Sequence, residues 1–210
     1  RNGASSGQKV DGIYAPGALT PIIQHKEIKM FRFRTAQLMT LVLLAGIPAC
    51  TVTAASIQVG FSPEGTAQQV VLNTINQSQQ SVRLMAYSFT SPEVVRALIS
   101  ARKRGVDVRV VIDEKGNTCD KCKASKAAMN LLVNAGIPLR TVSKYKIMHD
   151  KVIITDGANV ETGSYNFSTA ANKSNSENAI LIQDVPELAQ QYLQHWQSRW
   201  QAGRDWKSTY

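Results

Sequence analysis

The stretch HDKVIITDGANVETGSYNFS, residues 149–168, reads as two short strands joined by a turn. His149 and Lys151 are two positions apart, so an extended backbone directs both side chains to one face and Asp150 to the other. An imidazole and an ammonium are costly to bury in an otherwise apolar strand unless they line a polar cavity. The pattern therefore predicts a functional site on these paired strands.

The second strand ends in a similar pattern. Ser164 and Asn166 are also two positions apart, and they follow Gly163, whose missing side chain lets another backbone approach closely. If the strands pair, an imidazole, a cation, a hydroxyl and an amide converge. One cation with neutral donors suits two phosphate oxygens, and an unprotonated imidazole beside them can attack phosphorus. The residues favour a phosphoryl-transfer site.

The sequence gives no support to a metal or a nucleotide cofactor. A catalytic metal would need more His or carboxylate ligands, and His149 and His195 are the only histidines after residue 55. His195 lies between Gln194 and Trp196 in an amphipathic segment, where we expect a helix-surface or packing residue. Neither a G-x-G-x-x-G nor a P-loop pattern occurs. We therefore expect no cofactor.

The spacing resembles the signature of the phospholipase D superfamily, H-x-K-x4-D-x6-G-S-x-N. The matching residues are His149, Lys151, Asp156, Gly163, Ser164 and Asn166. The lead-in VVRALISARKRGVDVRVVID, residues 94–113, is also similar to that family, so the resemblance covers nearly all of residues 56–210. It is strongest to the small exported bacterial endonucleases that carry one signature per chain. Asp156 ends its strand at a turn, and we expect it to be structural.

The resemblance implies a role for each site residue. His149 would be the nucleophile that forms a phosphohistidine. Lys151, Ser164 and Asn166 would hold the non-bridging oxygens of the phosphodiester. Glu177 looks like the acidic residue of the family that hydrogen-bonds the histidine and fixes its tautomer. The alternative for Glu177 is a solvated carboxylate at the start of a strand.

The chemistry also requires a second histidine, which acts as general acid for the leaving oxygen and then as base for water. This chain carries one signature. The second His149 must then come from a second chain. We expect a two-fold homodimer whose active site spans the interface.

The rest of the chain predicts an α/β fold, with a mixed, mostly parallel β-sheet sandwiched by helices on both faces and one half-unit of the phospholipase D-like fold per chain. Period-two apolar patterns indicate strands near residues 56–63, 81–89, 106–113, 137–142, 148–156, 159–167 and 177–184. Helical spacing indicates helices near residues 65–78, 91–105, 126–136 and 185–203. Residues 114–125 read as a polar loop.

The N-terminal region has a different composition. Residues 1–29 read as an upstream or artificial extension, and residues 30–55 as a signal peptide cleaved before Ser56. The alternatives are an uncleaved anchor or lipidation at Cys50. Because the apolar run at 38–49 is short for a bilayer span, we expect an exported protein, periplasmic or secreted, whose mature domain is not stably inserted in a membrane.

Two cysteines follow the signal segment. Cys119 and Cys122 can close a local disulfide in an oxidising compartment. A zinc site would need a second ligand pair at similar spacing, and the chain has none. A thioredoxin-type redox motif is disfavoured because the cysteines follow a polar loop. We expect a structural disulfide that closes this loop.

The charge balance suits a polyanionic partner. The chain has a formal net charge of +9, and the part after residue 55 keeps 18 basic against 13 acidic residues, a net +5. Basic residues cluster at 102–104, at Lys121, Lys123 and Lys126, and at Lys144 and Lys146. We expect metal-independent hydrolysis of DNA, and of RNA as a further candidate substrate, with little sequence specificity. The alternatives are a phospholipase D-type lipid hydrolase and a nucleic-acid-binding protein without catalysis.

Overall fold

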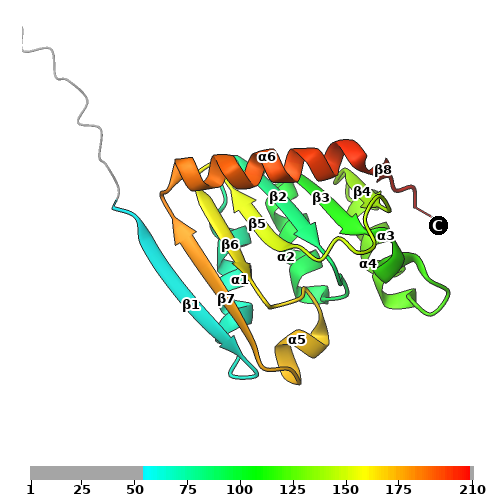
Figure 1. The fold of residues 1–210 in the computed structure, drawn as a ribbon, viewed down its shortest axis with the longest axis horizontal. Coiled ribbons are helices and arrows are strands. Elements are labelled where there is room, and N and C mark those ends of the chain that lie inside the picture. Colours follow the sequence, from blue (N-terminus) through cyan, green and yellow to red (C-terminus); the bar gives the residue numbers. More distant parts are fainter. Residues whose placement is uncertain (1–53, 209–210) are drawn as a thin grey trace, which may run out of the picture. The chain divides into compact units, whose positions relative to one another are not determined.

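The computed structural model describes residues 54–208, which build one mixed sheet in the order β1-β7-β6-β5-β2-β3-β4-β8 (Figure 1). The upstream extension, and all but the last two residues of the expected signal peptide, lie outside the described residues. The strands are β1 (Ser56–Ser62), β2 (Ser81–Ala86), β3 (Asp107–Asp113), β4 (Leu139–Val142), β5 (Lys151–Thr155), β6 (Asn159–Gly163), β7 (Glu177–Gln183) and β8 (Arg204–Asp205). The helices are α1 (Thr66–Gln77), α2 (Pro92–Lys103), α3 (Glu114–Thr118), α4 (Lys123–Asn134), α5 (Thr169–Lys173) and α6 (Pro186–Ala202).

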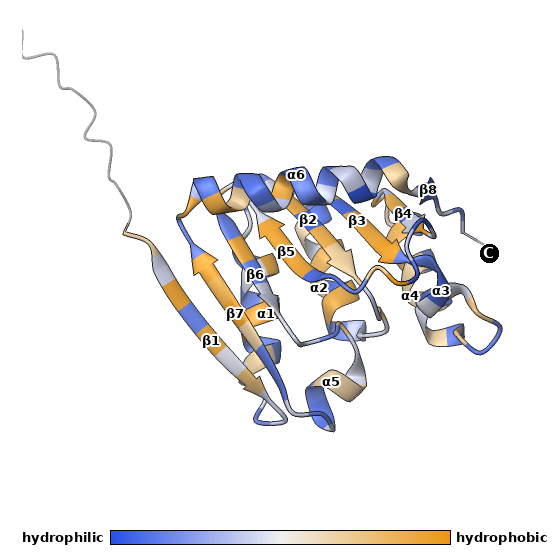
Figure 2. Ribbon diagram, in the orientation of Figure 1, coloured by the Kyte–Doolittle hydropathy of each residue, from blue (hydrophilic) through white to orange (hydrophobic). Residues whose placement is uncertain are grey.

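Helices cover both faces of the sheet. On one face, α1, α2 and α4 pack on a cluster that includes Val71, Leu98 and Ile153. On the other face, α6 crosses the central strands and packs its Trp196 on a second cluster with Val152. Figure 2 shows the apolar residues concentrated on the central strands, whereas α6 mixes polar and apolar positions. The predicted α/β class with helices on both faces is confirmed.

Local signals place α2 as the sequence predicts. The Ser91 hydroxyl accepts a hydrogen bond from Val94 N at 3.3 Å, and Pro92 occupies the first turn. At the other end, the Arg104 guanidinium donates to the carbonyls of Ile75 and Ser78 at the end of α1. These bonds tie the two helices together.

Two details of the prediction are wrong. Parallel pairing is confined to β2–β3 and β3–β4 among the described strands, and the other pairs are antiparallel, so the sheet is not mostly parallel. The tight turn between β5 and β6 allows only antiparallel pairing. The expected polar loop at 114–125 contains α3 and the start of α4, because the Asp113 carboxylate caps α3 by accepting from Gly116 N at 2.7 Å.

Candidate active site

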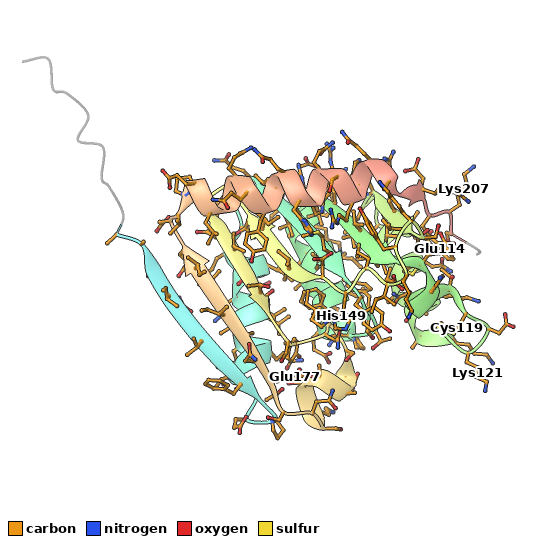
Figure 3. The ribbon with its side chains drawn as sticks, in the orientation of Figure 1. Glu114, Cys119, Lys121, His149, Glu177 and Lys207 are labelled. Atoms are coloured by element: carbon orange, nitrogen blue, oxygen red, sulfur yellow. A yellow bond between two sulfur atoms is a disulfide. The ribbon has the colours of Figure 1, made fainter. Side chains whose placement is uncertain are left out.

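Three adjacent strands bring Glu177 and the signature residues other than Asp156 to one end of the sheet. His149 precedes β5, Ser164 and Asn166 follow β6, and Glu177 begins β7. The pairs β5–β6 and β6–β7 are antiparallel, so these ends meet. Figure 3 shows His149 and Glu177 at the same end of the sheet. A cavity of about 410 Å³ there is lined by His149, Lys151, Gly163, Ser164, Asn166 and Glu177.

The His149 and Lys151 side chains are in direct contact, although β5 begins at Lys151 and His149 lies in the loop before it. The Lys151 ammonium lies 3.3 Å from each ring nitrogen of His149 and donates to the His149 carbonyl at 2.9 Å. Only 7% of Lys151 is exposed. Burial lowers the pKa of Lys151, while the carboxylates of Glu177 and Asp150 act in the opposite direction. The site therefore holds a largely desolvated cation beside a candidate nucleophile.

Asp150 points away from this cavity, as the strand alternation predicts. One of its carboxylate oxygens lies 3.1 Å from Nε2 of His195 on α6. The side chain of His195 is 38% exposed and makes its contact on the opposite face of the sheet from Lys151. His195 is thus outside the cavity that the signature residues line.

Glu177 contacts partners that the sequence did not predict. Its carboxylate accepts from the Ser164 hydroxyl at 2.6 Å and from Asn175 Nδ2 at 2.9 Å. Within a single chain, residues 54–208 form no hydrogen bond between Glu177 and His149, so the expected orienting bond is absent there. Instead, the carboxylate is engaged by Ser164, which follows the neighbouring strand β6. Glu177 acts on Ser164 by contact and on Lys151 through its charge.

Gly163 is required by the backbone of the next strand. A Cβ at this position would overlap the carbonyl oxygen of Asn178. That same oxygen accepts from the backbone N of Ser164 at 3.1 Å and of Tyr165 at 3.2 Å. The close approach predicted for the glycine therefore fixes the loop that presents the hydroxyl and the amide.

Asn166 lines the cavity with an incompletely satisfied amide. Its Oδ1 is buried and has no hydrogen-bond partner among residues 54–208. An amide can be oriented with either its oxygen or its NH₂ toward a ligand. Asn166 is thus available to donate to an anionic oxygen in the cavity.

Asp156 lies at the other end of β5 and supports the fold. It adopts a left-handed φ of 55°, and its carboxylate accepts from the backbone N of Gln79, Gln80 and Ser81 at 2.9, 2.7 and 2.9 Å. These bonds fix the turn before β2. The contacts agree with the structural role expected for Asp156.

The comparisons with known proteins agree with the signature. A protein-family model described as "Cardiolipin synthase, PLD-like domain" matches residues 71–200. The chain belongs to the phospholipase D superfamily. Within the superfamily, the solved structure of Nuc from Salmonella typhimurium, described as a phospholipase D family member, is 56% identical. That match has a TM-score of 0.72 and covers 74% of this chain and 100% of Nuc.

Two further relatives define how far this likeness extends. NucT from Helicobacter pylori is 23% identical with a TM-score of 0.63, over 73% of this chain and 100% of NucT, and shares the fold. A phospholipase D from Rickettsia conorii is 39% identical over 139 residues, which are 66% of this chain and 66% of that protein. The match therefore spans just under two thirds of this phospholipase D relative.

Two buried polar residues that sequence reasoning missed bind the main chain just before His149 and just after β2. The Asp113 carboxylate accepts from Met148 N at 2.7 Å, directly before His149. Asn117 is fully buried and donates through Nδ2 to the carbonyls of Tyr87 and Asp113 at 2.6 and 2.8 Å. Both lay in or beside the presumed polar loop. These two residues are near the site because of the order of the strands in the sheet. The sequence pattern does not reveal that order, so it could not identify them.

Three further observations concern the described part of the chain. Cys119 and Cys122 form a disulfide between α3 and α4. Residues 54–208 contain no group of three or more His, Cys, Asp or Glu side chains arranged to hold a metal ion. None of the described helices has the length and apolar character needed to cross a bilayer.

Proposed function

We propose that this protein is a metal-independent phosphodiesterase that hydrolyses DNA, with RNA as a second candidate substrate, and has little sequence specificity. The observation that carries the proposal is the buried Lys151 ammonium, 3.3 Å from both ring nitrogens of His149 in an open cavity. A fixed cation beside an imidazole can bind a phosphodiester and present its phosphorus to a nitrogen nucleophile.

The proposed reaction has two steps. A neutral ring nitrogen of His149 attacks phosphorus, and the bond from phosphorus to the leaving oxygen breaks. Lys151, Ser164 and Asn166 bind the non-bridging oxygens, whose negative charge is stabilised most by the desolvated ammonium. Water then displaces the histidine and releases the phosphate monoester. A second imidazole protonates the leaving oxygen in the first step and accepts the proton of water in the second.

The second imidazole is assigned to His149 of a second copy, in a two-fold homodimer. Exposed apolar residues support such an interface. Ile57, Val59 and Phe61, on one face of the edge strand β1, are 66%, 59% and 53% exposed, and Ile147, two residues before His149, is 49% exposed. Light scattering under assay conditions tests this point, and a fully active monomer would contradict it.

The basic residues support nucleic acid as the substrate. Lys144 and Lys146 are exposed just before His149, and the other two basic clusters lie at the start of α4 and at the end of α2. Lys121 lies between α3 and α4, and Lys123 and Lys126 lie in the first turn of α4; all three are exposed or half-exposed. This segment follows α3, which the Asp113 carboxylate caps at the end of β3 beside the site. The residues at 102–104 end α2 and lie far from Ser91, whose backbone N bonds to Phe167 near the site. We assign phosphate binding to the three lysines and a structural role to Arg104. The likeness to Nuc, described as a phospholipase D family member, supports the phosphodiesterase chemistry.

A phospholipid substrate is the second candidate, because curated relatives are named phospholipase D. Competition of plasmid DNA with phosphatidylcholine vesicles distinguishes the two substrates. DNA should inhibit release of the lipid head group, and vesicles should leave DNA cleavage unchanged. Preferential lipid hydrolysis that DNA does not inhibit would contradict the nuclease assignment.

A protein that binds nucleic acid without cutting it is the third candidate. The His149→Ala variant addresses it, since loss of cleavage with retained DNA affinity excludes an idle histidine. Export to the periplasm or the medium is part of the proposal, and most of the signal sequence on which it rests lies outside the described residues.

A further inference from the structure

Tyr87 lies directly beside the two central groups of the site. It follows β2, and its backbone N donates to the Asp150 carbonyl at 2.9 Å, which extends the β2–β5 pairing beyond Lys151. The ring centroids of Tyr87 and His149 are 4.7 Å apart, and their planes are inclined by 53°. The Lys151 ammonium lies 5.4 Å from the centroid of the Tyr87 ring. One aromatic ring therefore contacts both the candidate nucleophile and the candidate phosphate-binding cation.

Residues of α3 hold the main chain around Tyr87 from the side away from His149 and Lys151. The fully buried Asn117 donates to the Tyr87 carbonyl at 2.6 Å and accepts from Phe89 N at 3.1 Å. Gly116 lies against the ring, because a Cβ at Gly116 would come within 3.4 Å of Cε2 of Tyr87. The ring is thus confined between α3 on one side and the catalytic groups on the other. Such confinement is what a positioning role requires.

We propose that Tyr87 is a positioning residue whose aromatic face holds the Lys151 ammonium and the His149 imidazole in their mutual arrangement. The inference rests on the proposed roles of His149 and Lys151. The face of an aromatic ring carries negative potential and attracts a cation within about 6 Å, most strongly where the cation is desolvated. An aliphatic side chain of similar volume would fill the same space without this attraction.

The charge balance around Lys151 shows what the ring contributes. Burial disfavours the charged ammonium, and the charged groups that act on it are the carboxylates of Glu177 at the start of β7 and of Asp150 just before β5. The uncharged polar contacts come from the carbonyl and the ring nitrogens of His149. Asp150 is directed to the other face, where it contacts His195. The Tyr87 ring is therefore a further stabilising contact close to the ammonium.

The test compares Tyr87→Phe, which keeps the aromatic face and removes the hydroxyl, with Tyr87→Leu, which removes the aromatic face. The pKa of Lys151 is measured by NMR on protein with ¹³Cε-labelled lysine, and the Lys151→Gln variant assigns the resonance. We expect the pKa in Tyr87→Phe to match the wild type and the pKa in Tyr87→Leu to fall by about half to one pH unit. The kcat for bis(p-nitrophenyl) phosphate should fall about 10- to 100-fold in Tyr87→Leu and little in Tyr87→Phe.

The controls keep this result separate from folding and from the proposed function. If the NMR spectrum of Tyr87→Leu shows that this variant is not folded, Tyr87→Met provides a second variant without an aromatic ring. Unchanged pKa and kcat in the aliphatic variant would overturn the inference, and so would a Phe variant that behaves like the Leu variant. If the wild type hydrolyses no phosphodiester, the proposed function fails, and the pKa measurement still decides the contact between Tyr87 and Lys151.

Discussion

Replacement of Glu161 by Gln should change how the free energy of unfolding depends on pH. Glu161 lies on β6, where it pairs in register with Ile153 and Leu181, and it is 1% exposed. Its Oε2 has no hydrogen-bond partner among residues 54–208. Burial raises the pKa of the Glu161 carboxyl well above its ordinary value. The folded protein therefore keeps this group neutral at a pH where the unfolded chain ionises it.

The direction of this change follows from the linkage between proton binding and folding. A carboxyl with a raised pKa in the folded state contributes its stability fully below the unfolded pKa and loses it as pH rises toward the folded pKa. The Gln side chain does not titrate. The free energy of unfolding of Glu161→Gln should increase relative to that of the wild type by up to about 1.4 kcal/mol per pH unit above roughly pH 4.5. This increase ends where the buried carboxyl of the wild type itself ionises. Near pH 4 the variant should be no more stable than wild type, because unpaired amide donors cost about 1–3 kcal/mol.

Urea denaturation from pH 4 to pH 8 at one fixed protein concentration measures this difference. Glu93→Gln is the matched control, since the pKa of Glu93 is lowered, chiefly by a backbone hydrogen bond. That replacement should lose stability above the unfolded pKa of Glu93, which is the opposite sign. A difference between Glu161→Gln and wild type that is constant across this pH range would refute the reasoning.

Two further outcomes test the substrate and the assembly. Changing Lys121, Lys123 and Lys126 together to Gln should raise KM for plasmid and make its salt dependence shallower by about one unit of slope for each lysine that contacts phosphate. Hydrolysis of bis(p-nitrophenyl) phosphate should not change. Arg102→Gln with Lys103→Gln, which removes two positive charges at the end of α2, is the control, and an equal effect per charge removed would contradict the assignment. Dimers reassembled from equal amounts of wild type and His149→Ala should keep about one quarter of the wild-type activity if each site needs two copies of His149. Retention of about three quarters would indicate that one histidine per site is enough, and retention of about half would indicate that each chain acts independently.

The sequence predicted the parts of this site that depend on local spacing. His149, Lys151, Ser164 and Asn166 are close in the chain, and two adjacent antiparallel strands bring them together as expected. The N-cap at Ser91 is equally local. These features follow from residue order and backbone geometry, so a single sequence is enough to find them.

The features that the sequence missed depend on contacts between distant segments. Tyr87 reaches His149 because β2 pairs with β5, and Asn117 reaches Tyr87 because a capped turn folds residues 114–118 into α3. The predominance of antiparallel pairs has the same origin, because strand order is set by packing and not by the pattern within each strand. Glu177 was predicted from the resemblance to the superfamily, but its contact with Ser164 depends on the β6–β7 register.

Plasmid cleavage in excess EDTA, by the wild-type protein and by His149→Ala in parallel, tests the central claim most directly. The proposed mechanism assigns phosphate binding to Lys151 and nucleophilic attack to His149, so wild type should nick and degrade the plasmid in the chelator while the variant leaves it intact. Loss of wild-type cleavage in EDTA, or cleavage by His149→Ala at the wild-type rate, would contradict a histidine-based, metal-independent nuclease.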